Sequence, residues 1–114
     1  MVKSNYIPQK GDIVWLEFNP QSGHEQKGTR PALVISPEIY NSKTGLCLFM
    51  PITSKVKDYP FEVKVKTLKI SGVILSDQIK SLDFKARNIK FIDRLEEKAF
   101  NQTIEKVLLL IEKM

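Results

Sequence analysis

The loop from Gly23 to Pro31 combines residue types that could do phosphate chemistry, because it holds a carboxylate, Glu25, and a guanidinium, Arg30. Arginine presents a planar fork of donors that matches phosphate oxygens and keeps its proton at neutral pH. A neighbouring glutamate can accept a proton from a nucleophile. Two charges in a loop are also typical of a solvated ion pair, so the rest of the chain has to decide between these two interpretations.

Length and composition restrict the protein to one folded unit. A chain of 114 residues predicts a single domain, 1–114, and 42% hydrophobic with 27% charged residues is typical of a globular fold. The formal net charge of +5 favours a polyanionic partner, either nucleic acid or an acidic protein segment. The lysines are interleaved with apolar residues, so we expect the basic surface to belong to the fold; the alternative is lysines that serve only solubility.

Several functional classes are excluded by what the chain contains. One histidine, His24, and one cysteine, Cys47, exclude a metal site built from nitrogen and sulfur ligands. We expect no cofactor and catalysis without a metal, with a carboxylate-bound ion as the alternative. Cys47 lies in the apolar run Leu46–Met50, which predicts a buried core residue. The N-terminal residues lack the apolar core of a signal peptide, and no run is long enough to span a membrane, so we expect a cytoplasmic protein with no membrane partner.

The strands and helices that would position these residues are predicted from hydrophobic periodicity and turn residues. Alternating or β-branched runs bounded by proline, glycine and asparagine predict short strands, and their spacing predicts a small antiparallel barrel. The predicted strands span residues 12–18, 31–36, 46–53, 60–66, 72–76, 78–82 and 89–92. Residues 37–41 could form a single helical turn. In the first strand, apolar residues on both faces predict a largely buried backbone.

The C-terminal segment changes to a helical period. Five apolar residues fall on one face and predict a helix from about Leu95 to Glu112: Phe100, Ile104, Val107, Leu108 and Ile111. Asp93 and Glu96 resemble a capping arrangement. Leu109 and Leu110 leave that face, which indicates that the helix is contacted on a second side.

Six blocks of the sequence together resemble the MazF/PemK toxins, and the chromosomal MazF type in particular. They are Gly11–Trp15, Gly23–Pro31, Val34–Pro37, Met50–Ser54, Tyr59–Val63 and Leu75–Ser81, in the family's order. The resemblance extends from about Ile7 to Ile92, whereas the predicted C-terminal helix fits the family in length but carries no diagnostic motif.

The resemblance implies a mainly β fold, a small SH3-like (CcdB/PemK-type) curved antiparallel barrel with a C-terminal α-helix. It further implies a sequence-specific, metal-independent endoribonuclease that cleaves single-stranded mRNA to 2′,3′-cyclic phosphate and 5′-hydroxyl ends. Such toxins inhibit translation and growth, act as homodimers, and are neutralised by a cognate MazE-like antitoxin. The acidic C-terminal segment of that antitoxin would cover the RNA groove.

The resemblance assigns catalytic roles to two residues, and the chemistry of the loop adds a third. Arg30 and Thr53 match the family's catalytic arginine and threonine, which would clamp the non-bridging oxygens and bond the scissile phosphate as charge builds up. Glu25 is the natural base for the 2′-hydroxyl, with a non-catalytic loop carboxylate as the alternative. His24 has a suitable pKa for proton transfer, but the family motif does not require it, so we interpret it as an exposed spectator.

Single-stranded bases are read by stacking and by bonds to their edges, beside cationic groups. The residues in matching blocks that could bind RNA are Phe18, Gln26, Gln78 and Lys80, and Lys55 and Lys57 could contact backbone phosphates. The alternative for the two loop lysines is that they are simply solvated. Trp15 and Phe61 lie in well-patterned strands and are expected in the core.

Two other functional classes remain open. A toxin of the same fold could inhibit DNA gyrase by binding alone, as CcdB-like relatives do, but those rely on C-terminal residues and lack the loop found here. A catalytically dead RNA-binding barrel would be expected to have lost Arg30 or Thr53. Both residues are present, and the C-terminal residues 110–114 offer no obvious docking group, which favours the enzyme.

Overall fold

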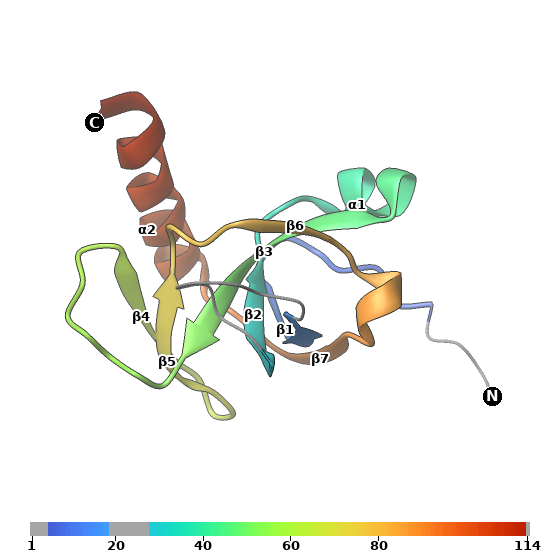
Figure 1. The fold of residues 1–114 in the computed structure, drawn as a ribbon, viewed down its shortest axis with the longest axis horizontal. Coiled ribbons are helices and arrows are strands. Elements are labelled where there is room, and N and C mark those ends of the chain that lie inside the picture. Colours follow the sequence, from blue (N-terminus) through green and yellow to red (C-terminus); the bar gives the residue numbers. More distant parts are fainter. Residues whose placement is uncertain (1–4, 19–27, 114) are drawn as a thin grey trace.

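The computed structural model describes residues 5–18 and 28–113, which form a strongly curled antiparallel sheet with a helix along one side (Figure 1). Its strands are β1 (Asp12–Glu17), β2 (Thr29–Val34), β3 (Leu46–Thr53), β4 (Glu62–Lys66), β5 (Ser71–Leu75), β6 (Lys80–Asp83) and β7 (Lys90–Arg94). The helical elements are α1 (Glu38–Thr44), the 3-10 turn η1 (Lys85–Arg87), α2 (Glu97–Leu108) and the π-helical turn η2 (Leu109–Lys113).

The longest strand, β3, organises the sheet. The strand order is β4-β5-β3-β2-β1-β7, with β6 also paired to β3. Because β2 occupies one edge of β3, β6 and β5 share the other: β6 pairs with Leu46–Phe49 and β5 with Ile52 and Thr53. At its end, β3 therefore pairs with β5 through Ile52 and Thr53, just beyond the last residue that pairs with β2.

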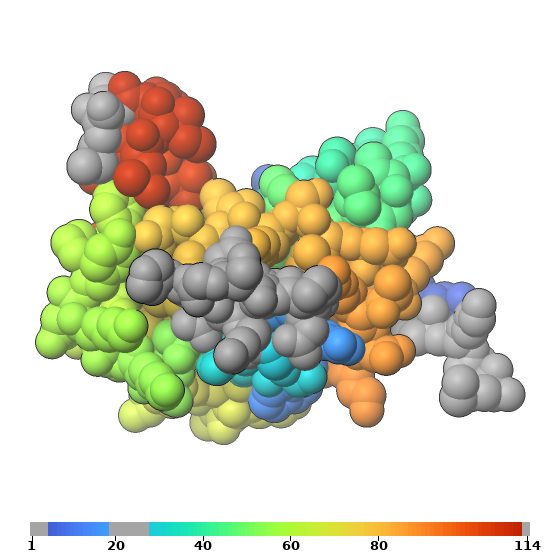
Figure 2. Space-filling view, in the orientation of Figure 1, coloured from blue at the N-terminus to red at the C-terminus, as the bar shows by residue number. Residues whose placement is uncertain are grey.

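The curled sheet buries a hydrophobic cluster on each face. One cluster joins Ile13, Leu33 and Met50 to Ala99 of α2, and the other joins Val14, Leu16, Phe18 and Phe49 to Phe84. Alternate residues of β1 thus enter different clusters, as the apolar residues on both faces of that strand predicted. In Figure 2 the C-terminal helix and α1 stand on either side of a notch, with the segment around β6 at its floor.

The mainly β fold with a C-terminal helix is confirmed, and each predicted strand is present, with ends shifted by up to about two residues, the usual uncertainty of boundaries. The predicted helical turn is the longer α1, which ends at Gly45 with a φ of 74°, in the left-handed region that glycine adopts without strain. The predicted capping arrangement is wrong. Glu96 is the N-cap of α2 and makes no side-chain capping bond, while Asp93 belongs to β7.

The prediction that Trp15 lies in the core is also wrong. Its side chain is 42% exposed, because its neighbours across the sheet are Pro31 and Lys90 rather than residues covered by a helix. Phe61 is half-buried, and Cys47 is fully buried as predicted. Within residues 5–18 and 28–113, none of the helices combines the length and apolar character that crossing a membrane would require.

Candidate functional site

Arg30 and Thr53, the two residues matched to catalytic positions, lie in the adjacent strands β2 and β3, two residues beyond the last pair of these strands. The register places Ala32 opposite Pro51. Continuing it by two residues puts Arg30 level with Thr53, and residues two apart in a strand point to the same face. Arg30 and Thr53 therefore extend from neighbouring strands on one face of the sheet.

The Thr53 hydroxyl is oriented by the backbone that follows it. The Lys55 N–H donates to Thr53 Oγ1 at 3.2 Å, and the residue is only 5% exposed. A hydroxyl that accepts one bond still has its own proton to donate. The arrangement therefore leaves Thr53 able to donate to a phosphate oxygen.

The backbone of Thr53 is in turn enclosed by β5. Thr53 pairs with Val73, and the adjacent Gly72 approaches so closely that a Cβ there would lie 2.4 Å from the Thr53 carbonyl oxygen. A contact that short does not occur between real atoms without a backbone shift, so the absence of a side chain at Gly72 sets where Thr53 lies.

Lys80 lies on the same face in β6, and Gln78 lies in the segment just before this strand. Lys80 pairs with Phe49, two pairs of residues along β3 from Thr53 and on the same face by alternation. Gln78 precedes Lys80 by two residues, and its N–H donates to the Leu75 carbonyl at 3.1 Å, which holds the turn. Both side chains are half-buried.

Phe18 requires a correction. Its ring is fully buried in the second hydrophobic cluster, with Leu16 and Phe49, so it offers no face on which a base could stack. Its N–H donates to the Gly28 carbonyl at 2.9 Å. The structure therefore indicates that Phe18 anchors the chain where residues 19–27 begin, rather than contacting RNA.

Three residues singled out from the sequence, His24, Glu25 and Gln26, lie outside the described residues. Lys55 and Lys57 are exposed in the loop that follows Thr53. The strand register thus places Arg30, Thr53 and Lys80 on one face, with Gln78 just before β6 and the two loop lysines directly after Thr53 in the chain.

Other reactive groups are placed away from this chemistry. Burial raises the pKa of the Cys47 thiol to about 11, with a smaller opposing effect from the Ser36 hydroxyl, so the thiol is protonated at neutral pH and is no nucleophile. Within the described residues, no three His, Cys, Asp or Glu side chains gather closely enough to hold a metal ion.

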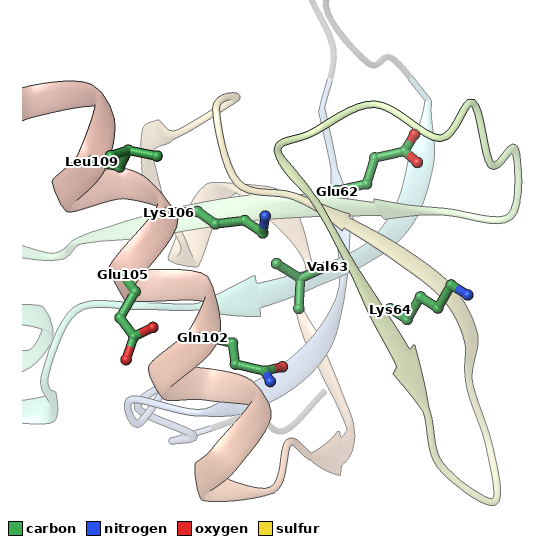
Figure 3. Close-up of a pocket in the computed structure, with 7 residues that line it drawn as sticks. All are labelled: Glu62, Val63, Lys64, Gln102, Glu105, Lys106 and Leu109. Atoms are coloured by element: carbon green, nitrogen blue, oxygen red, sulfur yellow. The ribbon is translucent and has the colours of Figure 1, made fainter. Parts of the chain in front are cut away.

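A cavity of the described structure lies apart from this face. It has a volume of about 600 Å³ and lies between α2 and β4 (Figure 3), lined by Glu62, Val63, Lys64, Gln102, Glu105, Lys106 and Leu109. Val63 belongs to the first hydrophobic cluster, on the side of the sheet that α2 covers. The cavity is open and mixed in charge, whereas the Arg30 face is cationic.

Glu62 was not selected from the sequence as a site residue. It is half-buried, with its carboxylate bonded to backbone N–H groups of the preceding loop. Gly72 also escaped prediction as a site residue, because a close backbone approach depends on strand pairing. The one sequence signal for Glu62 and Gly72 was their position within or close to the blocks that resemble the MazF/PemK toxins.

A curled antiparallel sheet whose strand ends gather an arginine, a threonine and further cations defines a barrel suited to binding a phosphodiester chain. Residues 9–111 match the family described as the PemK-like, MazF-like toxin of type II toxin–antitoxin systems, and the chain belongs to this family.

Relatives and solved structures agree with this assignment. The chain is 50% identical over 84 residues to the endoribonuclease toxin MazF of Escherichia coli K12, covering 74% of this chain and 76% of that one. MazF from Deinococcus radiodurans superposes with a TM-score of 0.90 at 42% identity, covering 94% and 98% of the two chains. A MazE–MazF complex from the same organism gives 0.85 at 42% identity, covering 96% and 100%.

Proposed function

We propose that this chain cleaves single-stranded RNA at short specific sequences without a metal ion, leaving 2′,3′-cyclic phosphate and 5′-hydroxyl ends. As a member of this toxin family with curated endoribonuclease relatives, it is an endoribonuclease toxin. The observation that supports the mechanism is the position of Arg30 and Thr53 in adjacent strands, two residues beyond the last pair of β2 with β3 and on the same face when that register is continued.

RNA supplies its own nucleophile, so a metal-free reaction needs a base and stabilisation of the phosphorane. The 2′-oxygen bonds to phosphorus while the bond from phosphorus to the 5′-oxygen breaks. Glu25 accepts the 2′-hydroxyl proton, and the departing 5′-oxygen takes up a proton from water. The Arg30 guanidinium and the Thr53 hydroxyl hold the non-bridging oxygens as their charge increases.

The remaining residues bind the RNA on either side of the reacting phosphate. Gln78 and Gln26 read base edges, and Lys80 binds the backbone from β6. Lys55 and Lys57 add phosphate contacts after Thr53. Since phosphate contacts carry no sequence information, the amide side chains contribute to the choice of cleavage sequence.

The protein is proposed to act in the cytoplasm, where mRNA is translated, as a homodimer of single-domain chains spanning 1–114. Exposed leucines and isoleucine at the end of α2 and in η2 support a second copy as partner. The related MazE–MazF complexes support an antitoxin partner. With a net charge of +5 here, an acidic C-terminal antitoxin segment would occupy the RNA surface and block it.

The test is cleavage of a long single-stranded RNA by the purified chain in EDTA, with mapping of cut sites and end groups. Cuts at a recurring short sequence with cyclic phosphate and 5′-hydroxyl ends are expected. Arg30→Ala should remain folded and lose cleavage, because no other group in the site matches the phosphate bidentately. Intact RNA, or substantial cutting by Arg30→Ala, would contradict the mechanism, and the next assays would then be gyrase inhibition and RNA binding without cleavage.

A further inference from the structure

The loop between β3 and β4, from Ser54 to Phe61, carries Lys55 and Lys57 directly after the Thr53 hydroxyl. Residues 54–60 are all exposed, so the loop has no hydrophobic interior of its own. A lysine on an unconstrained loop would lose much conformational freedom on binding a phosphate. The contacts that shape this loop therefore affect how well its lysines bind RNA.

Glu62, the first residue of β4, supplies such a contact. The Lys57 N–H donates to both carboxylate oxygens, at 3.1 and 3.3 Å, and the Tyr59 N–H donates to Oε1 at 3.4 Å. Figure 3 shows the Glu62 carboxylate directed away from α2 and toward this loop. One side chain thus holds two backbone donors of the loop at once.

The backbone between those donors has an unusual conformation. Asp58 has a φ of 55°, in the left-handed region that costs a non-glycine residue free energy. Successive N–H groups around such a residue can converge on an anion, as in the nests that bind phosphate. Here the anion is the chain's own carboxylate, which indicates that Glu62 stabilises a loop shape the backbone would otherwise avoid.

The second half of the loop has further supports. Ser76 donates to the Phe61 carbonyl through its N–H at 3.1 Å and its hydroxyl at 2.5 Å, and Lys106 Nζ of α2 donates to the Pro60 carbonyl at 2.6 Å. A hydrogen bond to Asp77 raises the pKa of Tyr59. These contacts hold the loop from Tyr59 onward. The backbone of Lys57, which precedes them, is held by its hydrogen bonds to Glu62.

We infer that Glu62 is a positioning residue for RNA binding, because its carboxylate shapes the loop that presents Lys55 and Lys57 beside Thr53. Glu62 itself touches no RNA in this arrangement. The inference rests on the proposed function and adds a residue to the binding of the same substrate.

Charge alone predicts the opposite effect of a substitution. Glu62 is a negative charge beside a cationic surface, and removing it should strengthen RNA binding if it acts only through its field. If it shapes the loop, removing it should weaken RNA binding although the protein becomes more positive. The sign of the change therefore distinguishes the two roles.

The experiment measures the Kd for an RNA spanning the first mapped cut site, with a 2′-O-methyl group at the cleaved position, across a salt series. Glu62→Ala is expected to raise the Kd by about three- to tenfold and to reduce the salt slope by about one, as expected for losing one to two phosphate contacts. Single-turnover cleavage at saturating RNA should stay within about twofold, because Arg30 and Thr53 remain in place.

Glu105→Ala is the matched control. Glu105 is an exposed carboxylate on α2 that lines the same cavity, so the variant makes the same charge change and is expected to leave the Kd unchanged or lower. A double-mutant cycle adds Lys57→Ala. The rise in Kd that Lys57→Ala causes should be smaller in the Glu62→Ala background, since the lysine is already misplaced there. The inference would be overturned if the two substitutions had additive effects on the binding free energy. It would also be overturned if Glu62→Ala bound RNA as tightly as the unaltered chain or more tightly.

Folding is followed by thermal unfolding and by amide hydrogen exchange at Lys57 and Tyr59, which should speed up in Glu62→Ala. If that variant does not fold, Glu62→Gln carries the test with a smaller rise in Kd, because it keeps one acceptor oxygen. Cleavage by the unaltered chain tests the proposed function separately. If it neither binds nor cuts RNA, both proposals fail, whereas normal cleavage with no effect at Glu62 rejects the inference alone.

Discussion

At the scale of residues, the hydroxyl of Thr53 on β3 offers the most direct test of the mechanism. Thr53→Val keeps the volume and β-branching of the buried side chain and removes its donor. We expect single-turnover cleavage to fall by about 10²- to 10³-fold, as for the loss of one donor to a developing oxyanion. The Kd for uncleavable RNA should change by less than about threefold, because the donor acts mainly in the transition state.

Thr53→Ser is the matched variant, since it retains the hydroxyl that accepts the Lys55 N–H. It should keep a substantial part of the activity. Equal losses in Thr53→Val and Thr53→Ser would show that packing at this buried position, and not the hydroxyl, limits the reaction.

The same residues show what a sequence can and cannot predict about a site. Arg30 and Thr53 could be selected from their chemistry and from family-like blocks, but alternation within a strand does not tell which strand lies beside it. Their shared face became visible only through the β2–β3 register. Phe18 and Trp15 were assigned to the wrong environments for a related reason: alternation separates two faces but not which parts of a face are covered.

At the scale of elements, the contact of β5 with β3 sets the position of Thr53. A Cβ at residue 72 would lie 2.4 Å from the Thr53 carbonyl oxygen and 3.0 Å from its carbon, so Gly72→Ala must push the two strands apart. We expect a lower free energy of unfolding by about 1–3 kcal/mol, typical of overpacking. Cleavage should fall further than unfolding explains, because the end of β3 moves.

Urea unfolding and single-turnover cleavage at a temperature where the variant is fully folded measure the two effects. Ser71→Ala is the control, since Ser71 is exposed on the same strand. Full activity in folded Gly72→Ala would mean that the strand separation does not reach the Thr53 hydroxyl.

Element types were easier to predict than the contacts between elements. Each of the predicted strands is present because periodicity and turn residues are local signals. The hydrogen bonds of the Glu62 carboxylate join residues that are close in the chain, but they depend on a loop conformation that periodicity does not predict. The helix α1 is also longer than the single turn that its sequence indicated.

At the scale of the whole molecule, the C-terminal end of α2 projects beyond the sheet and exposes apolar side chains (Figure 1). Leu108, Leu109 and Leu110 are each more than a third exposed, and Ile111 is 72% exposed. Exposed apolar side chains gathered at one end of a helix are typical of a protein interface, and a stable dimer buries about 800 Å² on each partner. We therefore expect a homodimer by sedimentation at micromolar concentration.

Placing charges on that surface should separate the two chains, because burying an unpaired carboxylate at an apolar interface costs several kcal/mol. The variant Leu108→Glu with Ile111→Glu is expected to sediment as a folded monomer. Leu68→Glu is the matched control: Leu68 is fully exposed in the turn between β4 and β5, away from α2, and the variant should remain dimeric. Dimers of unchanged strength in the double variant would place the interface elsewhere, and a monomeric unaltered chain would remove the homodimer from the proposed function.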